Sequence, residues 1–253
     1  MKKLFDWWVP DQESSGIRGE CMKIGILTPT RQRHLKRKRF HDSVIDLAER
    51  KENIFCYYYI DNDDPEISNY SSQELYNAID IVGEPISVSK SWNVLAEKAI
   101  ADGAEILIMG NDDLVYLSSG WDTELQESIS IFKDKIYCAW FEDKINGSKH
   151  CAFPIVSKEW YNCLGYFTPG VFNFGYNDTW VFDIAKKINR CHFIPMIQTE
   201  HKHFSVNKSD YDQTYARNRT QERGELYHKD QTIFNNTKNV RLEDAKKLRA
   251  LMR

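Results

Sequence analysis

The sequence lacks any apolar run close to the roughly 18–20 residues that a helix needs to cross a bilayer. It also lacks an excess of basic residues, because 34 lysines and arginines face 37 acidic residues and the net charge is -3. The overall charge therefore gives no argument for nucleic-acid binding, although local basic patches remain possible. The N-terminal stretch "MKKLFDWWVPDQESSG" turns acidic and polar too early for the apolar core of a signal peptide. We expect a cytoplasmic protein without a transmembrane segment.

None of the cysteines stands in a C-x-x-C pair, and internal repeats and low-complexity linkers are also missing. Most of the cysteines have apolar or aromatic neighbours, which is typical of reduced, buried thiols; they are Cys21, Cys56, Cys138, Cys151, Cys163 and Cys191. The 253 residues are 42% hydrophobic and 28% charged. This length and composition suit one large α/β domain or two small ones.

In the first half of the chain, apolar strand patterns alternate with helical ones. Strands are predicted over 23–27, 53–61 and 104–110, and helices over 34–51 and 91–103. The repeated order of strand, polar turn and helix implies a mostly parallel sheet flanked by helices. In such sheets, ligands bind at the carboxyl ends of the strands.

The second half is less regular. The pattern predicts two strands around a turn at Asn146 and Gly147, then a helix, another strand and a C-terminal amphipathic helix, at 135–143, 150–160, 176–189, 190–197 and 242–253. We expect the last helix to pack on the body of the protein, with Leu242, Leu248 and Met252 towards one side.

Acidic residues follow two of the predicted strands. Asn111, Asp112 and Asp113 come directly after strand 104–110, and Asp61 ends strand 53–61. A hard divalent cation prefers carboxylate oxygens, so the first cluster is a candidate metal site. A solvated turn explains the same residues equally well. Asp61 could accept hydrogen bonds from a ribose or a base, or it could simply belong to a turn.

Basic and histidine residues give two further candidates. Arg31 and Arg33 follow the first strand, where a phosphate would meet a helix N-terminus. The basic residues at 36–39 continue round the helix, as a solvated face or a patch for a polyanionic acceptor. His201 and His203 stand two residues apart and share one face of a strand. They either take part in a metal site or have a structural role.

Six segments, in this order, resemble the nucleotide-sugar glycosyltransferases of the GT-A fold and family-2 type. They are "ILTPTRQRHLKRKRFHDSV", "YYYIDNDDP", "SKSWNVLAEKA", "ILIMGNDDLVYLSSGWD", "FGYNDTWVFDIAKK" and "EHKHF" followed by "TY". The sequence is most similar to small bacterial and phage members that have a T-x-R-x-R opening and an H-x-H ending. The resemblance covers about 22–219, and it implies an N-terminal arm at 1–21, a single GT-A domain at 22–219 and a helical tail at 220–253.

The resemblance also implies roles for particular residues. Asp113 would hold a Mn2+ or Mg2+ ion from the family's D-x-D position, His201 or His203 would complete the metal shell, and Asp178 would be the general base of an inverting enzyme. The remaining implied residues would line the nucleotide pocket: Thr28, Pro29, Thr30, Arg31, Arg33, Asp61, Lys90, Asn93, Asn111 and Asp112. Asp61 would contact the uracil or ribose.

These roles describe a metal-dependent transferase that moves a sugar, with inversion, from a UDP-sugar or related donor to an acceptor hydroxyl. The acceptor could be a polysaccharide, a lipid-linked glycan or hydroxymethylated phage DNA. Aromatic residues could form a stacking platform or belong to the core: Trp140, Trp160, Tyr166, Phe172, Phe174 and Tyr176.

Two alternatives stay open at the level of sequence. A non-catalytic module that binds a nucleotide or a glycan is favoured by Asn111, which stands where the family has Asp. A nucleotidyltransferase would usually show a glycine-rich phosphate loop after the first strand, and "TPTRQR" contains no glycine.

Overall fold

The computed structural model describes residues 22–71, 73–203, 207–208, 211–218 and 220–252, so the predicted arm at 1–21 lies outside the described residues. The strands are β1 (Ile24–Thr30), β2 (Ile54–Asp61), β3 (Ala78–Gly83), β4 (Ile106–Met109), β5 (Leu114–Tyr116), β6 (Cys138–Glu142), β7 (Ile155–Ser157) and β8 (Cys191–His201). The helices are α1 (His34–Asp46), α2 (Val88–Ala101), α3 (Trp121–Ile129), α4 (Lys158–Leu164), α5 (Asn177–Ile188), α6 (Gln213–Asn218), α7 (Gln221–Asn236) and α8 (Lys238–Arg249).

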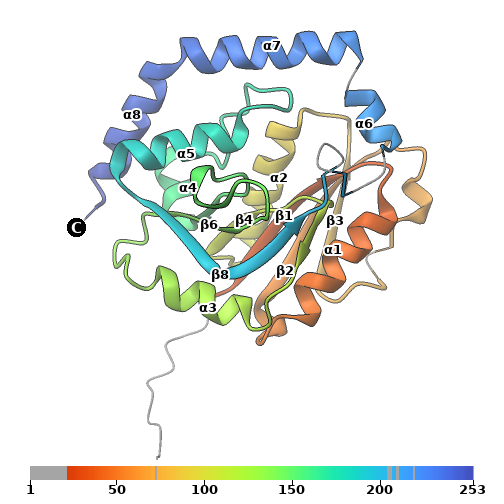
Figure 1. Cartoon of the computed structure of the whole chain (residues 1–253), viewed down its shortest axis with the longest axis horizontal. Helices are drawn as coiled ribbons and strands as arrows, with labels where there is room; N and C mark the ends of the chain where they lie inside the picture. The colour runs from red at the N-terminus through yellow and green to blue at the C-terminus, as the bar shows by residue number, and fades with distance from the viewer. Residues whose placement is uncertain (1–21, 72, 204–206, 209–210, 219, 253) are drawn as a thin grey trace, which may run out of the picture.

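The described strands form one mixed sheet in the order β3-β2-β1-β4-β7-β6-β8-β5. The pairs β2–β3, β1–β2, β1–β4 and β6–β8 are parallel, whereas β4–β7, β6–β7 and β5–β8 are antiparallel. The sheet lies at the centre of the molecule with helices around it (Figure 1). The mostly parallel, helix-flanked α/β architecture predicted from the sequence is therefore confirmed.

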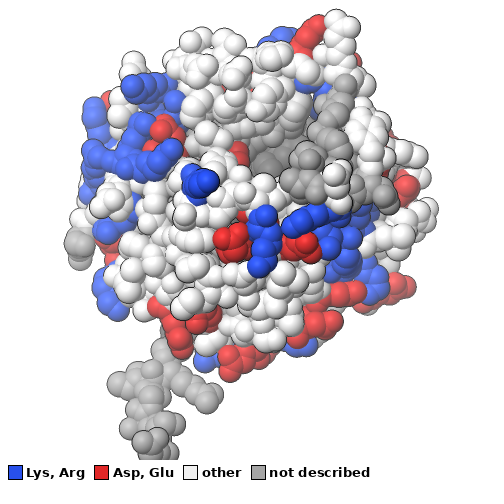
Figure 2. Space-filling view, in the orientation of Figure 1, with Lys and Arg blue, Asp and Glu red and all other residues white. Residues whose placement is uncertain are grey.

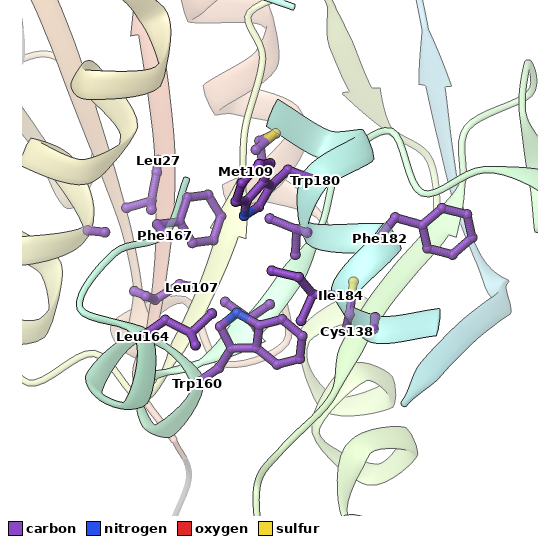
Figure 3. Close-up of a cluster of buried hydrophobic side chains, with 14 of the residues drawn as sticks. Leu27, Leu107, Met109, Cys138, Trp160, Leu164, Phe167, Trp180, Phe182 and Ile184 are labelled. Atoms are coloured by element: carbon purple, nitrogen blue, oxygen red, sulfur yellow. The ribbon is translucent and has the colours of Figure 1, made fainter. Parts of the chain in front are cut away.

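Both faces of the sheet are buried, which explains why the central strands are almost continuously apolar. On β2, Tyr57 joins one core cluster and Tyr58 joins the other, because successive side chains point to opposite faces. The first cluster is covered by α2, α4, α5 and α8, and Figure 3 shows part of it around Trp160 and Trp180. The second cluster is covered by α1 and α3. The result is a three-layer core.

Several element boundaries differ from those predicted. The predicted strand at 150–160 is a strand only over Ile155–Ser157, and α4 begins at Lys158. The Ser157 hydroxyl causes the change, since it accepts a hydrogen bond from the Trp160 amide (3.0 Å) and caps the helix. The pattern also missed β3, β5, α3 and α7, and it extended α1 to residue 51 although that helix ends at Asp46.

The C-terminal helix α8 packs against α4 and α5, and hydrogen bonds from Arg241 attach it further. The buried Arg241 side chain donates to Asp183 Oδ2 (2.6 Å) and to the Phe234 carbonyl (2.7 Å). Leu248 is fully buried in the first core cluster, as predicted. Leu242 was placed wrongly: its side chain is 38% exposed, because Arg241 and Ala245 occupy the face that meets α5.

The described cysteines differ in burial: Cys56, Cys138 and Cys151 are buried, Cys163 is half-buried and Cys191 is exposed. Cys56, Cys138, Cys151, Cys163 and Cys191 are free, and Cys21 lies outside the described residues. No helix in the described ranges combines the length and the apolar character that crossing a membrane requires.

The packing of α8 gives a direct test. Leu248→Ala should lower the free energy of unfolding by about 2–5 kcal/mol, because it leaves a cavity in the first core cluster. Leu242→Ala, on the same helix, should change it by about 0.5 kcal/mol or less. Urea unfolding followed by circular dichroism measures both. Equal effects would show that α8 does not pack on the core through Leu248.

Candidate active site

A cavity of about 830 Å³ opens at the carboxyl ends of β1, β2 and β4, beside the N-terminus of α2. It lies where an open, mostly parallel sheet holds ligands. Of the predicted site residues, those that line it are Pro29, Thr30, Arg31, Arg33, Asp61, Lys90, Asn111, Asp112, Asp113, His201 and His203. Ten of these come from the ends of β1, β2, β4 and β8 and the segments after them, because the fold turns all four ends to one side.

The turn after β4 is packed tightly onto β1. A Cβ atom added at Gly110 would lie 2.2 Å from the Thr28 hydroxyl oxygen, so a glycine is needed at this crossing. Thr28 itself is fully buried beneath the cavity and is not part of its lining. The close approach fixes the turn whose next residues are Asn111, Asp112 and Asp113.

Asp112 is committed to contacts inside the protein. Its carboxylate accepts from Thr30 Oγ1 and from Arg33 Nη1, both at 2.8 Å, and the residue is 2% exposed. Burial raises the pKa of Asp112, and the Arg33 guanidinium opposes that rise. Asp112 therefore joins the β4–β5 turn to the loop after β1 and is not oriented as a metal ligand.

Arg33 lies between two carboxylates. Besides Asp112, it donates from Nε and Nη2 to the two oxygens of Asp212 (3.0 and 3.1 Å). Burial acts against the charge, but Asp112 and Asp212 together raise the pKa of Arg33. A ligand phosphate could recruit this guanidinium only by breaking buried ion pairs, so its described role is structural.

Arg31 and Asp61 meet at the rim of the cavity. Arg31 Nη1 donates to Asp61 Oδ2 (2.9 Å), and the same nitrogen also pairs with Asp63. Burial opposes the charge of Arg31, while Asp63 and Asp61 raise its pKa. The guanidinium holds the Asp61 carboxylate in the lining of the cavity, to which Tyr59 and Pro85 also belong.

Asp113 and His201 are brought together by the pairing of β5 with β8. Leu114 is opposite His201 in this antiparallel register, so the preceding Asp113 reaches the imidazole. Asp113 Oδ1 lies 3.4 Å from His201 Nε2, and both residues are largely buried. Neither ring nitrogen of His201 makes a hydrogen bond within the part of the chain that the structure describes. The His203 ring centroid is 5.3 Å from that of His201.

This arrangement fits a divalent cation shared with a substrate. Buried imidazole nitrogens without hydrogen bonds are costly, and a cation between carboxylate and imidazole would satisfy one of them. Among the described residues, no three or more His, Cys, Asp and Glu side chains form a metal cluster. The chain thus offers few ligands, which suits Mg2+ or Mn2+ held jointly by protein, water and phosphate oxygens.

Two predicted residues on α2 differ in their placement. Lys90 lines the cavity from the first turn of α2. Its backbone amide donates a hydrogen bond to the N-cap hydroxyl, Ser87 Oγ (3.3 Å). Asn93 does not line it. Its side chain accepts from the amides of Phe167 and Thr168 (both 2.9 Å) and donates to the Thr168 carbonyl (2.7 Å). Asn93 fixes the loop before α5.

Asp178 lies in the first turn of α5 and outside the lining of the cavity, four residues after Phe174, which does line it. Its Oδ2 is 2.8 Å from His150 Nε2, and its Oδ1 accepts from Thr179 Oγ1 (3.3 Å). The Asp178 carboxylate raises the pKa of His150. The stabilisation from this pair is fully present below about pH 6.5, and it is lost as the pH rises through the raised pKa.

The sequence did not predict that α6 and α7 contribute to the cavity lining. Arg217, Glu222, Arg223 and Leu226 line the cavity, as does Thr214. The segment "ARNRTQER" carries a visible basic signal, but nothing local to it indicates that the neighbouring Thr214 contacts Arg31, 183 residues away.

Most of the proposed aromatic platform belongs to the core. Trp140, Trp160 and Phe172 are buried, so they cannot stack on a ligand in the cavity. Tyr166 and Tyr176 are partly buried and pack against the first core cluster, and neither lines the cavity. Phe174 lines the cavity.

Searches against family models and against curated proteins found no match. Solved structures do match. S. aureus TarS has a TM-score of 0.54 at 12% identity over 71% of this chain and 36% of its own. TarS 1-349 in complex with UDP-GlcNAc gives 0.56 at 12% identity, over 71% and 58%. The Pyrobaculum calidifontis mannosyltransferase PcManGT, in complex with GDP-Man and Mn2+, gives 0.53 at 10%, over 70% and 56%.

This chain thus spans between about a third and three fifths of the length of these structures. TarS and the mannosyltransferase have the GT-A fold of nucleotide-sugar glycosyltransferases. The GT-A fold predicted from the sequence motifs is confirmed by this likeness.

The buried pair of Asp112 and Arg33 gives a testable prediction. Asp112→Ala should lower the free energy of unfolding by about 3 kcal/mol or more, because it removes one of the carboxylates that compensate a buried guanidinium. Asp42→Ala, which breaks the exposed pair with Lys38, should have a much smaller effect, because solvent screens that pair. Urea unfolding at pH 7 compares them. Similar small losses would show that Asp112 is not a structural residue.

Proposed function

We propose that this protein is a metal-dependent glycosyltransferase, which moves a sugar from a nucleotide-sugar donor to an acceptor hydroxyl with inversion. The observation that carries the proposal is the pairing of Asp113 with the largely buried His201, whose ring nitrogens make no hydrogen bond to any residue that the structure describes, in a cavity at the strand ends. The GT-A fold supports it. Further support comes from neighbours whose complexes contain UDP-GlcNAc, or GDP-Man with Mn2+.

In the proposed mechanism, Asp113 and His201 would hold the cation, and the His203 ring lies beside that of His201. Mn2+ or Mg2+ would supply electrostatic stabilisation of the diphosphate that leaves the sugar. Asp61, held by Arg31, would accept hydrogen bonds from the base or ribose of the nucleotide. Lys90, at the N-terminus of α2, adds a positive charge to the same cavity.

Asp178 is the proposed general base. Its pairing with His150 orients the carboxylate through Oδ2, and an acceptor hydroxyl would compete with Thr179 for Oδ1. A carboxylate within hydrogen-bond reach can take the hydroxyl proton as the oxygen attacks the sugar carbon. A single attack on the face opposite the leaving diphosphate gives inversion.

The donor we propose is a UDP-sugar, and the acceptor is a polysaccharide, a lipid-linked glycan or hydroxymethylated DNA. Residues 22–219 would form the glycosyltransferase domain. The tail at 220–253 would complete its cavity, since Glu222, Arg223 and Leu226 belong to the lining.

Metal dependence is the first test of the function. The wild type should bind UDP with Mn2+ at least 10-fold more tightly than after chelation, because Asp113 would hold the cation and the cation would offset the negative charge of the diphosphate. Asp113→Ala should bind UDP equally weakly under both conditions. Isothermal titration calorimetry measures the four affinities. Equal wild-type affinity with and without metal would remove Asp113 from the donor site.

The proposed base is tested by Asp178→Asn. Asn has nearly the same shape as Asp but is a far poorer base, so transfer should fall by about 100-fold or more while UDP binding is kept. Loss of the carboxylate should also lower the pKa of His150, which an NMR titration can follow. A lowered pKa of His150 would show that the pair between Asp178 and His150 is broken. Near-normal transfer despite it would exclude Asp178 as the base.

Wild-type protein that binds donor but transfers sugar to no acceptor would favour the alternative of a binding module. A panel of UDP- and GDP-sugars, with glycan, lipid-linked and hydroxymethylated DNA acceptors, makes that comparison.

A further inference from the structure

The side of the cavity formed by α6 and α7 carries two arginines that the site described above does not use. Arg217 lies on α6 and Arg223 lies in the first turns of α7. Both line the cavity, and neither forms an ion pair within the described ranges of the chain. In this they differ from Arg31 and Arg33, each of which is paired with two aspartates.

The positions of these arginines are fixed at both ends of the segment that carries them. At its start, the Asp212 carboxylate binds Arg33, and the Thr214 hydroxyl donates to the Arg31 carbonyl (2.9 Å). Further along, the buried Asp230 carboxylate accepts hydrogen bonds from the backbone amides of 173–175, at 2.9–3.1 Å. Figure 1 shows α7 spanning the molecule from α6 to α8. The helices α6 and α7 thus form one wall of the cavity.

Electrostatics make this wall suited to an anion. Burial lowers the pKa of Arg217, and the positive charges of Arg31 and Arg223 lower it further, so the guanidinium groups repel one another. The carboxylates of Asp61 and Asp63 raise the pKa of Arg217. Glu222 adds one carboxylate to the wall. On the face shown in Figure 2, basic and acidic side chains alternate near the middle.

We propose that Arg217 and Arg223 bind the phosphate groups of the substrate, in place of the paired Arg31 and Arg33. The proposal rests on the proposed function and deepens it: the ligand class is a diphosphate that reaches from a cation at Asp113 to the α6–α7 wall. A guanidinium matches phosphate oxygens with two parallel hydrogen bonds. A diphosphate has enough oxygens to meet the cation and the arginines at once.

Inorganic pyrophosphate, UDP and uridine are the probes for the test. Arg217→Gln and Arg223→Gln should each weaken binding of pyrophosphate and UDP by about 10-fold, since each removes a charge-assisted contact. Uridine affinity should not change. Lys229→Gln is the matched control, because Lys229 is exposed on α7 outside the cavity lining. It should leave all three affinities unchanged. Calorimetry with Mn2+ gives the affinities, and thermal unfolding confirms that the variants are folded.

Unchanged pyrophosphate affinity in the double variant Arg217→Gln/Arg223→Gln would overturn the proposal. Equal weakening for uridine and UDP would also overturn it, because the arginines would then act on the nucleoside. The use of pyrophosphate separates this test from that of the function. A wild type that binds pyrophosphate but no nucleotide-sugar would disprove the proposed donor, while the variants would still decide where the phosphates bind.

Discussion

The buried guanidinium of Arg33 is the contact on which the cavity depends. It lies between Asp112, in the β4–β5 turn, and Asp212, just before α6, and so joins three segments that are far apart in the sequence. A buried charge is tolerated only when it is well paired, so these segments must come together for the fold to be stable. The cavity is the space that they enclose with the strand ends.

Neighbouring acidic residues have different roles because of this contact. Asp112 turns inward to Arg33 and Thr30, whereas Asp113 faces His201. The adjacent carboxylates noticed in the sequence are therefore one structural residue and one candidate metal ligand. The pairing of β5 with β8 decides which is which, since it places the imidazole next to Asp113.

The C-terminal helices belong to the site as well as to the core. Leu248 and Arg241 attach α8 to the body, while Asp230 on α7 holds the loop at 173–175 that lines the cavity. This loop leads into α5 and Asp178. The position of the proposed base is therefore coupled, through a buried carboxylate, to the helix that carries Arg223.

The sequence by itself determined the strand–helix alternation, the parallel arrangement and the cluster of polar residues after β1, β2 and β4. These follow from local periodicity and from the rule that parallel strands end at one edge. Tertiary structure alone decided that Arg33 and Asn93 are tied to protein partners and that α6 and α7 supply part of the wall. The reason is physical: local patterns encode which face of an element is apolar, whereas the partner of a buried charge depends on contacts between distant segments.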